Sequence, residues 1–329
     1  MVFVTGGSGL IGSFLIPELL KRGYGVRASF RGQVPEIKGT EAVEWVDGDV
    51  LDIAFLRDAI QDVSYVFHCA GVVSYDPQDK ALLKHVNIEG TANVVNACLE
   101  NGNLKLCHVS SIAAVGRPKG VAILNESSKW DQAEEHSAYA SSKYFGELEV
   151  WRGVAEGLKA VIVNPSVILG PADWSRSSTR LFKYVHDEHR FYTGGQANFV
   201  DIRDVVEAML QLTFSEITGE RFIVNAGQMA YKEFFDSVAT CLHKKGPSVK
   251  VPPALAEVIW RLERFRSVLT GARPLITKET ARVSAKNHLF SNDKIKKASG
   301  LEFRSLNETI AWVCTQLQEK TAVISGYGK

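Results

Sequence analysis

The sequence has little of what would direct it to a membrane, a nucleic acid or a metal ion. No apolar run approaches the roughly 20 residues that a membrane-spanning helix needs. The 38 lysines and arginines nearly balance the 37 aspartates and glutamates, which leaves no electrostatic basis for a nucleic-acid or membrane-surface partner. The five cysteines are odd in number and lack metal-ligand spacing, so we expect free thiols in the reducing cytoplasm and no metal site.

What the chain does contain is an alternation of short apolar runs and amphipathic stretches. With 45% hydrophobic residues over 329 positions, it can bury a sizeable core. The runs that predict strands cover residues 2–5, 25–29, 43–47, 65–68, 105–110 and 159–164. The stretches that predict helices lie at residues 11–22, 53–60, 82–101 and 138–157. Strands separated by helices predict an α/β fold with a Rossmann-type, doubly wound parallel sheet.

The pattern changes after Pro165. Two further strand-like runs, at 198–200 and 221–225, flank a predicted helix at 205–212, and the last hundred residues are mostly helical in character. One amphipathic stretch there opens at Pro252-Pro253. We predict an NAD(P)-binding domain and a smaller, mostly helical C-terminal substrate lobe, the first from residues 1–165 and 197–226, the second from 166–196 and 227–329.

A glycine-rich segment directly follows the first predicted strand and opens the first predicted helix. Residues 5–12 read Thr-Gly-Gly-Ser-Gly-Leu-Ile-Gly, and glycines at this spacing let the backbone turn tightly and approach a pyrophosphate. The N-terminus of the following helix adds free N–H groups and a partial positive charge. We predict that a nicotinamide dinucleotide is bound there by Gly6, Gly9, Leu10, Ile11 and Gly12.

The end of the second predicted strand indicates which nucleotide is bound. Enzymes that use NAD usually place an acidic residue there to accept a hydrogen bond from the ribose 2′-OH, but residues 26–32 contain none. Arg31 can instead pair with the 2′-phosphate of NADP, although a solvated surface arginine would give the same pattern. We predict NADP, with NAD as the alternative.

Two more strand ends complete the predicted cofactor site. Asp49 and Val50 follow the third strand, where the adenine would lie; Asp49 either accepts from the adenine amino group or caps the next helix. At the end of the fourth strand, Ala70 and Gly71 are small enough for the cofactor to pass close to the backbone. We interpret His68, which precedes them, as a structural histidine.

The predicted catalytic groups come from separate parts of the chain. Tyr139 and Lys143 lie four apart in a predicted helix, so the ammonium can lower the pKa of the phenol and also bind the nicotinamide ribose. Ser111 ends the fifth strand, at the edge of the sheet where ligands bind, and can donate to a carbonyl oxygen. Asn87 can hold a water behind the lysine, or simply occupy a helix face. Pro165 ends the sixth strand and can set backbone groups against the nicotinamide carboxamide.

These residues resemble the extended short-chain dehydrogenase/reductase superfamily. The resemblance covers roughly residues 1–225 and is carried by residues 5–12, 48–52, 68–71, 87–94, 110–111, 139–143, 164–171 and 199–206. It implies a Rossmann domain, a substrate lobe, a catalytic set of Ser111, Tyr139 and Lys143, and a homodimer formed through the helices at 82–101 and 138–157. Residues 26–31 and 164–171 look like the dihydroflavonol reductase and 3β-hydroxysteroid dehydrogenase branch.

The leading hypothesis is an NADP-dependent oxidoreductase that reduces a small ketone or aldehyde, with Tyr139 as general acid. Sugar-nucleotide dehydratases carry Asp-Glu after the catalytic hydroxyl residue, and this chain has Ile112-Ala113 there. A nucleotide-sugar epimerase with bound NAD and a non-catalytic NADP-binding redox sensor remain as alternatives. The expected partner is a small molecule, and residues Ser74, Tyr75 and Trp174 are candidates for the wall of its site.

Overall fold

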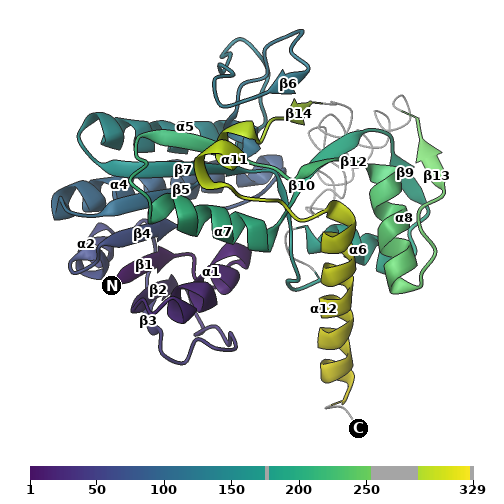
Figure 1. The fold of residues 1–329 in the computed structure, drawn as a ribbon, viewed down its shortest axis with the longest axis horizontal. Coiled ribbons are helices and arrows are strands. Elements are labelled where there is room, and N and C mark those ends of the chain that lie inside the picture. Colours follow the sequence, from purple (N-terminus) through teal and green to yellow (C-terminus); the bar gives the residue numbers. More distant parts are fainter. Residues whose placement is uncertain (175–177, 253–287, 327–329) are drawn as a thin grey trace. The chain divides into compact units, whose positions relative to one another are not determined.

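The computed structural model describes residues 1–174, 178–252 and 288–326, and the chain divides into two compact units (Figure 1). The first unit consists of Met1–Pro165, Ile202–Val224 and Ser291–Glu302. The second consists of Ser166–Asp201, Asn225–Phe290 and Phe303–Lys329. This division differs from the predicted one at residues 197–201, 225–226 and 291–302.

A parallel sheet of seven strands forms the centre of the first unit, in the order β11-β7-β5-β4-β1-β2-β3. The order runs outward in both directions from β1 and β4, so the chain reverses its direction of winding there, at the point where such sheets bind ligands. The predicted Rossmann-type sheet is confirmed. Its strands are β1 Val2–Thr5, β2 Val26–Phe30, β3 Glu44–Asp47, β4 Tyr65–His68, β5 Lys105–Val109, β7 Lys159–Pro165 and β11 Glu220–Val224.

Helices cover both faces of this sheet, which is why its inner strands are apolar without alternation. On one face α2 (Ile53–Ile60), α4 (Gly90–Asn101) and α5 (Ala138–Ala155) pack together, and the core between them and the sheet includes Val66 and Leu106. The other face carries α1 (Leu10–Lys21) and α7 (Ile202–Thr213), which contact each other (Figure 1). All residues of β1 and β5 are buried.

The helix predicted over residues 82–101 is present, but its hydrogen-bonding pattern changes partway along. The segment begins with α3 (Lys80–Lys84), passes through a π-helical turn at His85–Glu89 and continues as α4. A π-helical turn inserts one extra residue, and such turns are frequent at functional sites. Here the wide turn carries Asn87, whose side-chain contacts are described below.

A short helix from the C-terminal part of the chain completes the first unit. This helix, α11 (Asp293–Ser299), contacts β11 and α7, and Lys294 from its first turn pairs with Glu220 at 2.9 Å. The sequence analysis assigned these residues to the substrate lobe. The local sequence of a helix does not indicate the strand against which the helix packs.

The second unit has its own core and more sheet than the sequence predicted. β10 (Gln196–Asp201) pairs in parallel with β8 (Val167–Leu169) and antiparallel with β12 (Gly227–Ala230). Its core is formed by α6, α8 and α12, with residues such as Phe182, Phe234 and Ile310. The bounds of its remaining elements are α6 Thr179–His186, β9 Phe191–Thr193, α8 Tyr231–Leu242, β13 Val249–Val251, β14 Leu289–Phe290 and α12 Leu306–Gly326.

Within the described residues, no helix is long and apolar enough to cross a membrane. The amphipathic stretch predicted after Pro252 lies outside the described residues.

Candidate active site

The glycine-rich segment forms a tight loop between β1 and α1. Gly6 has a positive φ of 69°, and a Cβ added to it would lie 2.7 Å from the backbone nitrogen of Ala70. A Cβ on Gly12 would lie 2.5 Å from the Gly6 carbonyl oxygen. Gly9 caps α1 in an extended conformation and no acidic side chain stands in the first turn, which includes Leu10 and Ile11. This bare backbone at a helix N-terminus fits a pyrophosphate.

Arg31 and Asp49, both predicted to contact the cofactor, lie together beyond the ends of β2 and β3. Arg31 Nη1 pairs with Asp49 Oδ2 at 3.0 Å, and the arginine side chain is 65% exposed. Asp49 also accepts a hydrogen bond from the backbone of Leu51. Val50 is buried, and its side chain fills the space that a Cβ on Gly90 would need. Arg31 therefore has a partner in the chain yet keeps a solvent-facing surface.

The end of β4 is tied to the end of β1. Thr5 Oγ1 hydrogen-bonds His68 Nδ1 at 2.7 Å and accepts from the backbone of Ala70 at 3.2 Å. The other ring nitrogen of His68 contacts Thr91 Oγ1 at 3.0 Å. Burial lowers the pKa of His68 to about 3, so the ring is neutral. These contacts support the structural role that we predicted for His68, and they bring Ala70 and Gly71 beside the glycine loop.

Lys143 lies against this same region. The helix α5 begins at Ala138, with Ser137 accepting from the backbone of Ala140 as its cap. One turn later, Lys143 Nζ donates to the Val109 carbonyl at 2.8 Å and lies 3.4 Å from the position of a Cβ on Gly71. Burial lowers the pKa of Lys143 to about 8, and the charge of Glu147 opposes this shift.

Tyr139 lies one helical turn before Lys143 and hydrogen-bonds Ser111. Burial raises the pKa of the Tyr139 phenol, nearby Tyr75 adds to the shift, and a hydrogen bond with Ser111 opposes it. The two tyrosine rings are 5.6 Å apart, edge to face. Ser111 follows β5 in an extended conformation and accepts a hydrogen bond from the backbone of Ala113. The hydroxyls of Tyr139 and Ser111 thus meet just after β5, and the ammonium of Lys143 binds the last carbonyl of the same strand.

Asn87 uses both ends of its amide within the protein. Its Oδ1 accepts from Val72 N at 2.8 Å, and its Nδ2 donates to Val72 O and to Ser142 Oγ, each at 2.9 Å. The side chain therefore holds the segment after β4 against α5. Whether Asn87 also holds a water behind Lys143 is a separate role, and it stays a prediction.

The remaining predicted residues are less connected. Pro165 ends β7 opposite Val224 of β11, and its contact with the cofactor stays a prediction. Tyr75 lies beside Tyr139, whereas Ser74 donates to Asp79 at 2.6 Å. Trp174 belongs to the second unit, where it packs on His186. Among the described residues, no group of three or more His, Cys, Asp or Glu side chains is arranged to hold a metal ion.

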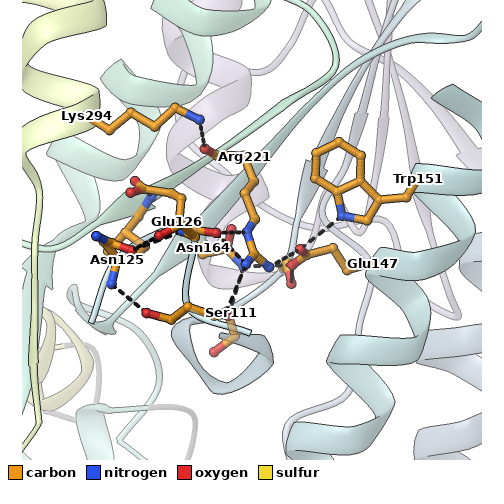
Figure 2. A network of polar contacts seen from close by, with 12 residues as sticks. Ser111, Asn125, Glu126, Glu147, Trp151, Asn164, Arg221 and Lys294 are labelled. Carbon is orange, nitrogen blue, oxygen red and sulfur yellow. Dashed lines mark hydrogen bonds and ion pairs between the residues drawn. The ribbon is translucent and has the colours of Figure 1, made fainter. Parts of the chain in front are cut away.

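Sequence reasoning missed Glu147, Arg221 and the amide of Asn164. Asn164 donates to the Ser111 carbonyl and to Glu147, and Glu147 pairs with Arg221 (Figure 2). The available signal was the spacing, because Glu147 stands four residues after Lys143 and eight after Tyr139, on the same helical face. The pairing with β7 and β11 has no local signature.

The chain is similar to a known protein family and to several known proteins. The model of the NAD dependent epimerase/dehydratase family matches residues 2–227. "Sterol demethylase protein B" of Methylococcus capsulatus is 32% identical, over 78% of this chain and 79% of its own. "Cinnamoyl-CoA reductase 1" of Oryza sativa is 30% identical, over 96% of this chain and 90% of its own. "Putative dihydroflavonol 4-reductase" of Synechocystis is 28% identical, over 94% and 92%.

Solved structures agree with this relationship. The crystal structure of gox2253 is 28% identical and superposes with a TM-score of 0.83, over 97% of this chain and 98% of its own. The predicted likeness to extended short-chain dehydrogenase/reductases of the dihydroflavonol reductase type is therefore confirmed. The chain belongs to the NAD-dependent epimerase/dehydratase family and is an NAD(P)-dependent oxidoreductase.

Proposed function

We propose that this chain reduces a small ketone or aldehyde to an alcohol with NADPH. The observation that carries the proposal is that Tyr139 hydrogen-bonds Ser111 while Lys143, one turn later on the same helix, lies beside Gly71. The neighbour of Gly71, Ala70, lies against Gly6 of the phosphate loop. Relatives named as reductases support reduction over isomerisation.

Each catalytic group has one task in this proposal. The bound nicotinamide supplies the hydride. Ser111 donates a hydrogen bond to the substrate carbonyl oxygen and holds it in line with the phenol. Tyr139 then gives its proton to that oxygen as negative charge develops on it. In the opposite direction, from alcohol to carbonyl, the same phenol accepts the proton.

Lys143 makes this proton transfer possible near neutral pH. Burial and Tyr75 both keep the pKa of the Tyr139 phenol high, so a tyrosinate at this position needs a nearby positive charge. Lys143, with a pKa of about 8, carries an ammonium at neutral pH and stands one helical turn from Tyr139. The same ammonium binds the ribose hydroxyls of the cofactor in this proposal.

The preference for NADP rests on Arg31. Because no acidic residue ends β2, nothing there accepts from a ribose 2′-OH in the way that NAD enzymes require. Arg31 is exposed enough to turn its free donors to a 2′-phosphate while Asp49 holds one of them.

We further propose a cytoplasmic homodimer that pairs α4 and α5 of two copies. Leu82 precedes α4, and Phe145 and Leu148 lie on α5; their side chains are all at least 40% exposed. Light scattering measures the mass in solution, and a monomer at micromolar concentration would contradict the dimer.

The test of the proposed function combines a substrate panel with one substitution. NADPH oxidation is measured with aldehydes, ketones and hydroxysteroids, for the native chain and for Tyr139→Phe. We expect turnover on at least one carbonyl, a loss of at least about 100-fold in kcat for the variant, and unchanged NADPH affinity. Undiminished activity of the variant refutes the proposal. Tightly held NAD together with turnover of a UDP-sugar would show an epimerase instead.

A further inference from the structure

A buried carboxylate, that of Glu147, belongs to a polar network that also includes Ser111, Asn164 and Arg221 (Figure 2). The Glu147 side chain is 2% exposed. Oε2 accepts from Ser110 Oγ and from Asn164 Nδ2, both at 2.8 Å. Oε1 accepts from Arg221 Nη1 at 2.8 Å and from Trp151 Nε1 at 3.3 Å. Two donors on each oxygen is the arrangement expected of an ionised carboxylate.

Arg221, the cationic partner, is itself held from several sides. Its Nε and Nη2 donate to the carbonyl of Glu126 at 3.0 Å and 2.6 Å. Lys294 Nζ donates to the carbonyl of Arg221 at 2.8 Å, and Glu126 Oε1 accepts from the backbone of Ile223 (Figure 2). The guanidinium cannot turn away from Glu147 without breaking its two bonds to the Glu126 carbonyl, so it fixes the position of Glu147.

The network reaches Ser111 along two routes. Ser110, whose hydroxyl donates to Glu147, directly precedes it in the chain. Asn164 uses its Nδ2 for both Glu147 and the Ser111 carbonyl, at 2.8 Å and 3.0 Å. The backbone of Ser110 also donates to Val163 O at 2.8 Å. The backbone of Ser111 is therefore held on both sides, and its hydroxyl oxygen is placed by the bond that it accepts from Ala113 N.

The charge of Glu147 also acts on Lys143, one turn earlier on α5. Burial lowers the pKa of Lys143, and Glu147 opposes that shift. The other titratable groups that act on this lysine are neutral near pH 7. Burial raises the pKa of the Cys69 thiol, and it lowers the pKa of both His68 and His108. Glu147 is therefore the ionised group among them.

We propose that Glu147 is a positioning residue of this active site. It holds Ser111 through Ser110 and Asn164, and it keeps Lys143 in its ammonium form. This inference rests on the proposed reductase function. It adds an internal carboxylate, tied to β5, β7 and β11, as the group on which the geometry and the charge of the site depend.

The decisive variant is Glu147→Gln, which keeps the size and removes the charge. One end of the new amide then points an NH2 group at two donors, so at least one of the present bonds is lost. The matched control is Glu149→Gln, the same change two residues further along α5, where the carboxylate is 31% exposed and pairs with Arg152. For each protein, kcat/KM and the Kd of NADPH are measured from about pH 6 to about pH 10.

We expect kcat/KM of Glu147→Gln at pH 7 to fall roughly 30-fold, as for loss of a charged hydrogen bond, while the melting curve stays cooperative. The pH at which NADPH binding weakens should also fall by about one unit, because one nearby negative charge is gone. Glu149→Gln should match the native chain in both measurements. A Glu147→Gln protein that behaves like this control overturns the proposal.

A second variant covers the case in which Glu147→Gln does not fold. Ser110→Ala removes one bond and no charge, so we expect a loss of roughly fivefold in kcat/KM with an unchanged pH midpoint. Full activity of this variant contradicts the first route to Ser111. The binding measurement needs no turnover. A native chain that binds NADPH but reduces no carbonyl therefore refutes the proposed function, while the shift in the binding midpoint still decides the role of Glu147.

Discussion

The two edges of the site are built in different ways. At the phosphate loop, backbone atoms form the surface, and the nearest ion pair, Arg31 with Asp49, is largely exposed. At the ends of β5 and β7, side chains and not backbone atoms form the site. The ion pair between Glu147 and Arg221 is enclosed there, with the carboxylate 2% exposed.

The two edges are therefore sensitive to different substitutions. A surface made of backbone tolerates many changes nearby but not an added Cβ that enters it. A buried network tolerates no loss of a partner, because the remaining charge keeps its desolvation cost without its compensation. An exposed pair is screened by water and contributes little to folding, so we expect its loss to cost little stability.

The largest expected effect is on the backbone edge. In Gly12→Ala, the new methyl group would lie 2.5 Å from the Gly6 carbonyl and 2.6 Å from the Gly7 carbonyl, so the loop must open. We expect NADPH affinity to fall on the order of 100-fold, measured by fluorescence titration. The control is Gly25→Ala, where a Cβ meets only the flexible end of Met1 at 3.2 Å. Equal affinity for both variants would contradict this account of the loop.

A smaller effect is expected from the exposed ion pair. Arg31→Ala should raise the Kd of NADPH about 20-fold, since a charged hydrogen bond to the 2′-phosphate is lost, and leave the Kd of NADH unchanged. The control is Arg57→Ala, which removes another exposed arginine, paired with Glu100. An equal loss for NADPH and NADH would place Arg31 outside the recognition of the 2′-phosphate.

The smallest effect on kcat/KM near neutral pH is expected from the titration of Lys143. The pKa of Lys143 is lowered from the ordinary lysine value to about 8, so the ammonium is present below that pH and is lost above it. We expect kcat/KM to be level from about pH 6 to about pH 7.5 and to fall about tenfold per unit once the pH is well above 8. A profile that stays level to about pH 10 would remove the lysine charge from the mechanism.

The fold of the first unit was predictable because its signals are local. A strand covered on both faces, such as β7, is a plain apolar run, and the turn into α1 requires glycines that can be seen in the sequence. Placing α11 on β11 depends on a contact between residues 73 apart, for which the sequence has no period or motif. The small strands of the second unit are too short to show alternation.

The site residues also differ in whether their contacts are local or long-range in the sequence. Tyr139 and Lys143 share one helix, so their proximity follows from the helical repeat. The pairing of Arg31 with Asp49 depends on the order of strands, and the role of Glu147 depends on partners from β5, β7 and β11. From the sequence alone, a glutamate on a helix is expected at the surface. Only the structure shows the donors that make Glu147 a buried residue.

The measurement that tests the central claim most directly is a crystal structure of the chain with NADPH bound. Our account places the pyrophosphate on the first turn of α1, the ribose next to the nicotinamide within hydrogen-bond distance of Lys143, and the nicotinamide beside Ser111 and Tyr139. Cofactor density that leaves Tyr139 and Lys143 without contact, or that lies away from the Gly6–Gly12 loop, would contradict it.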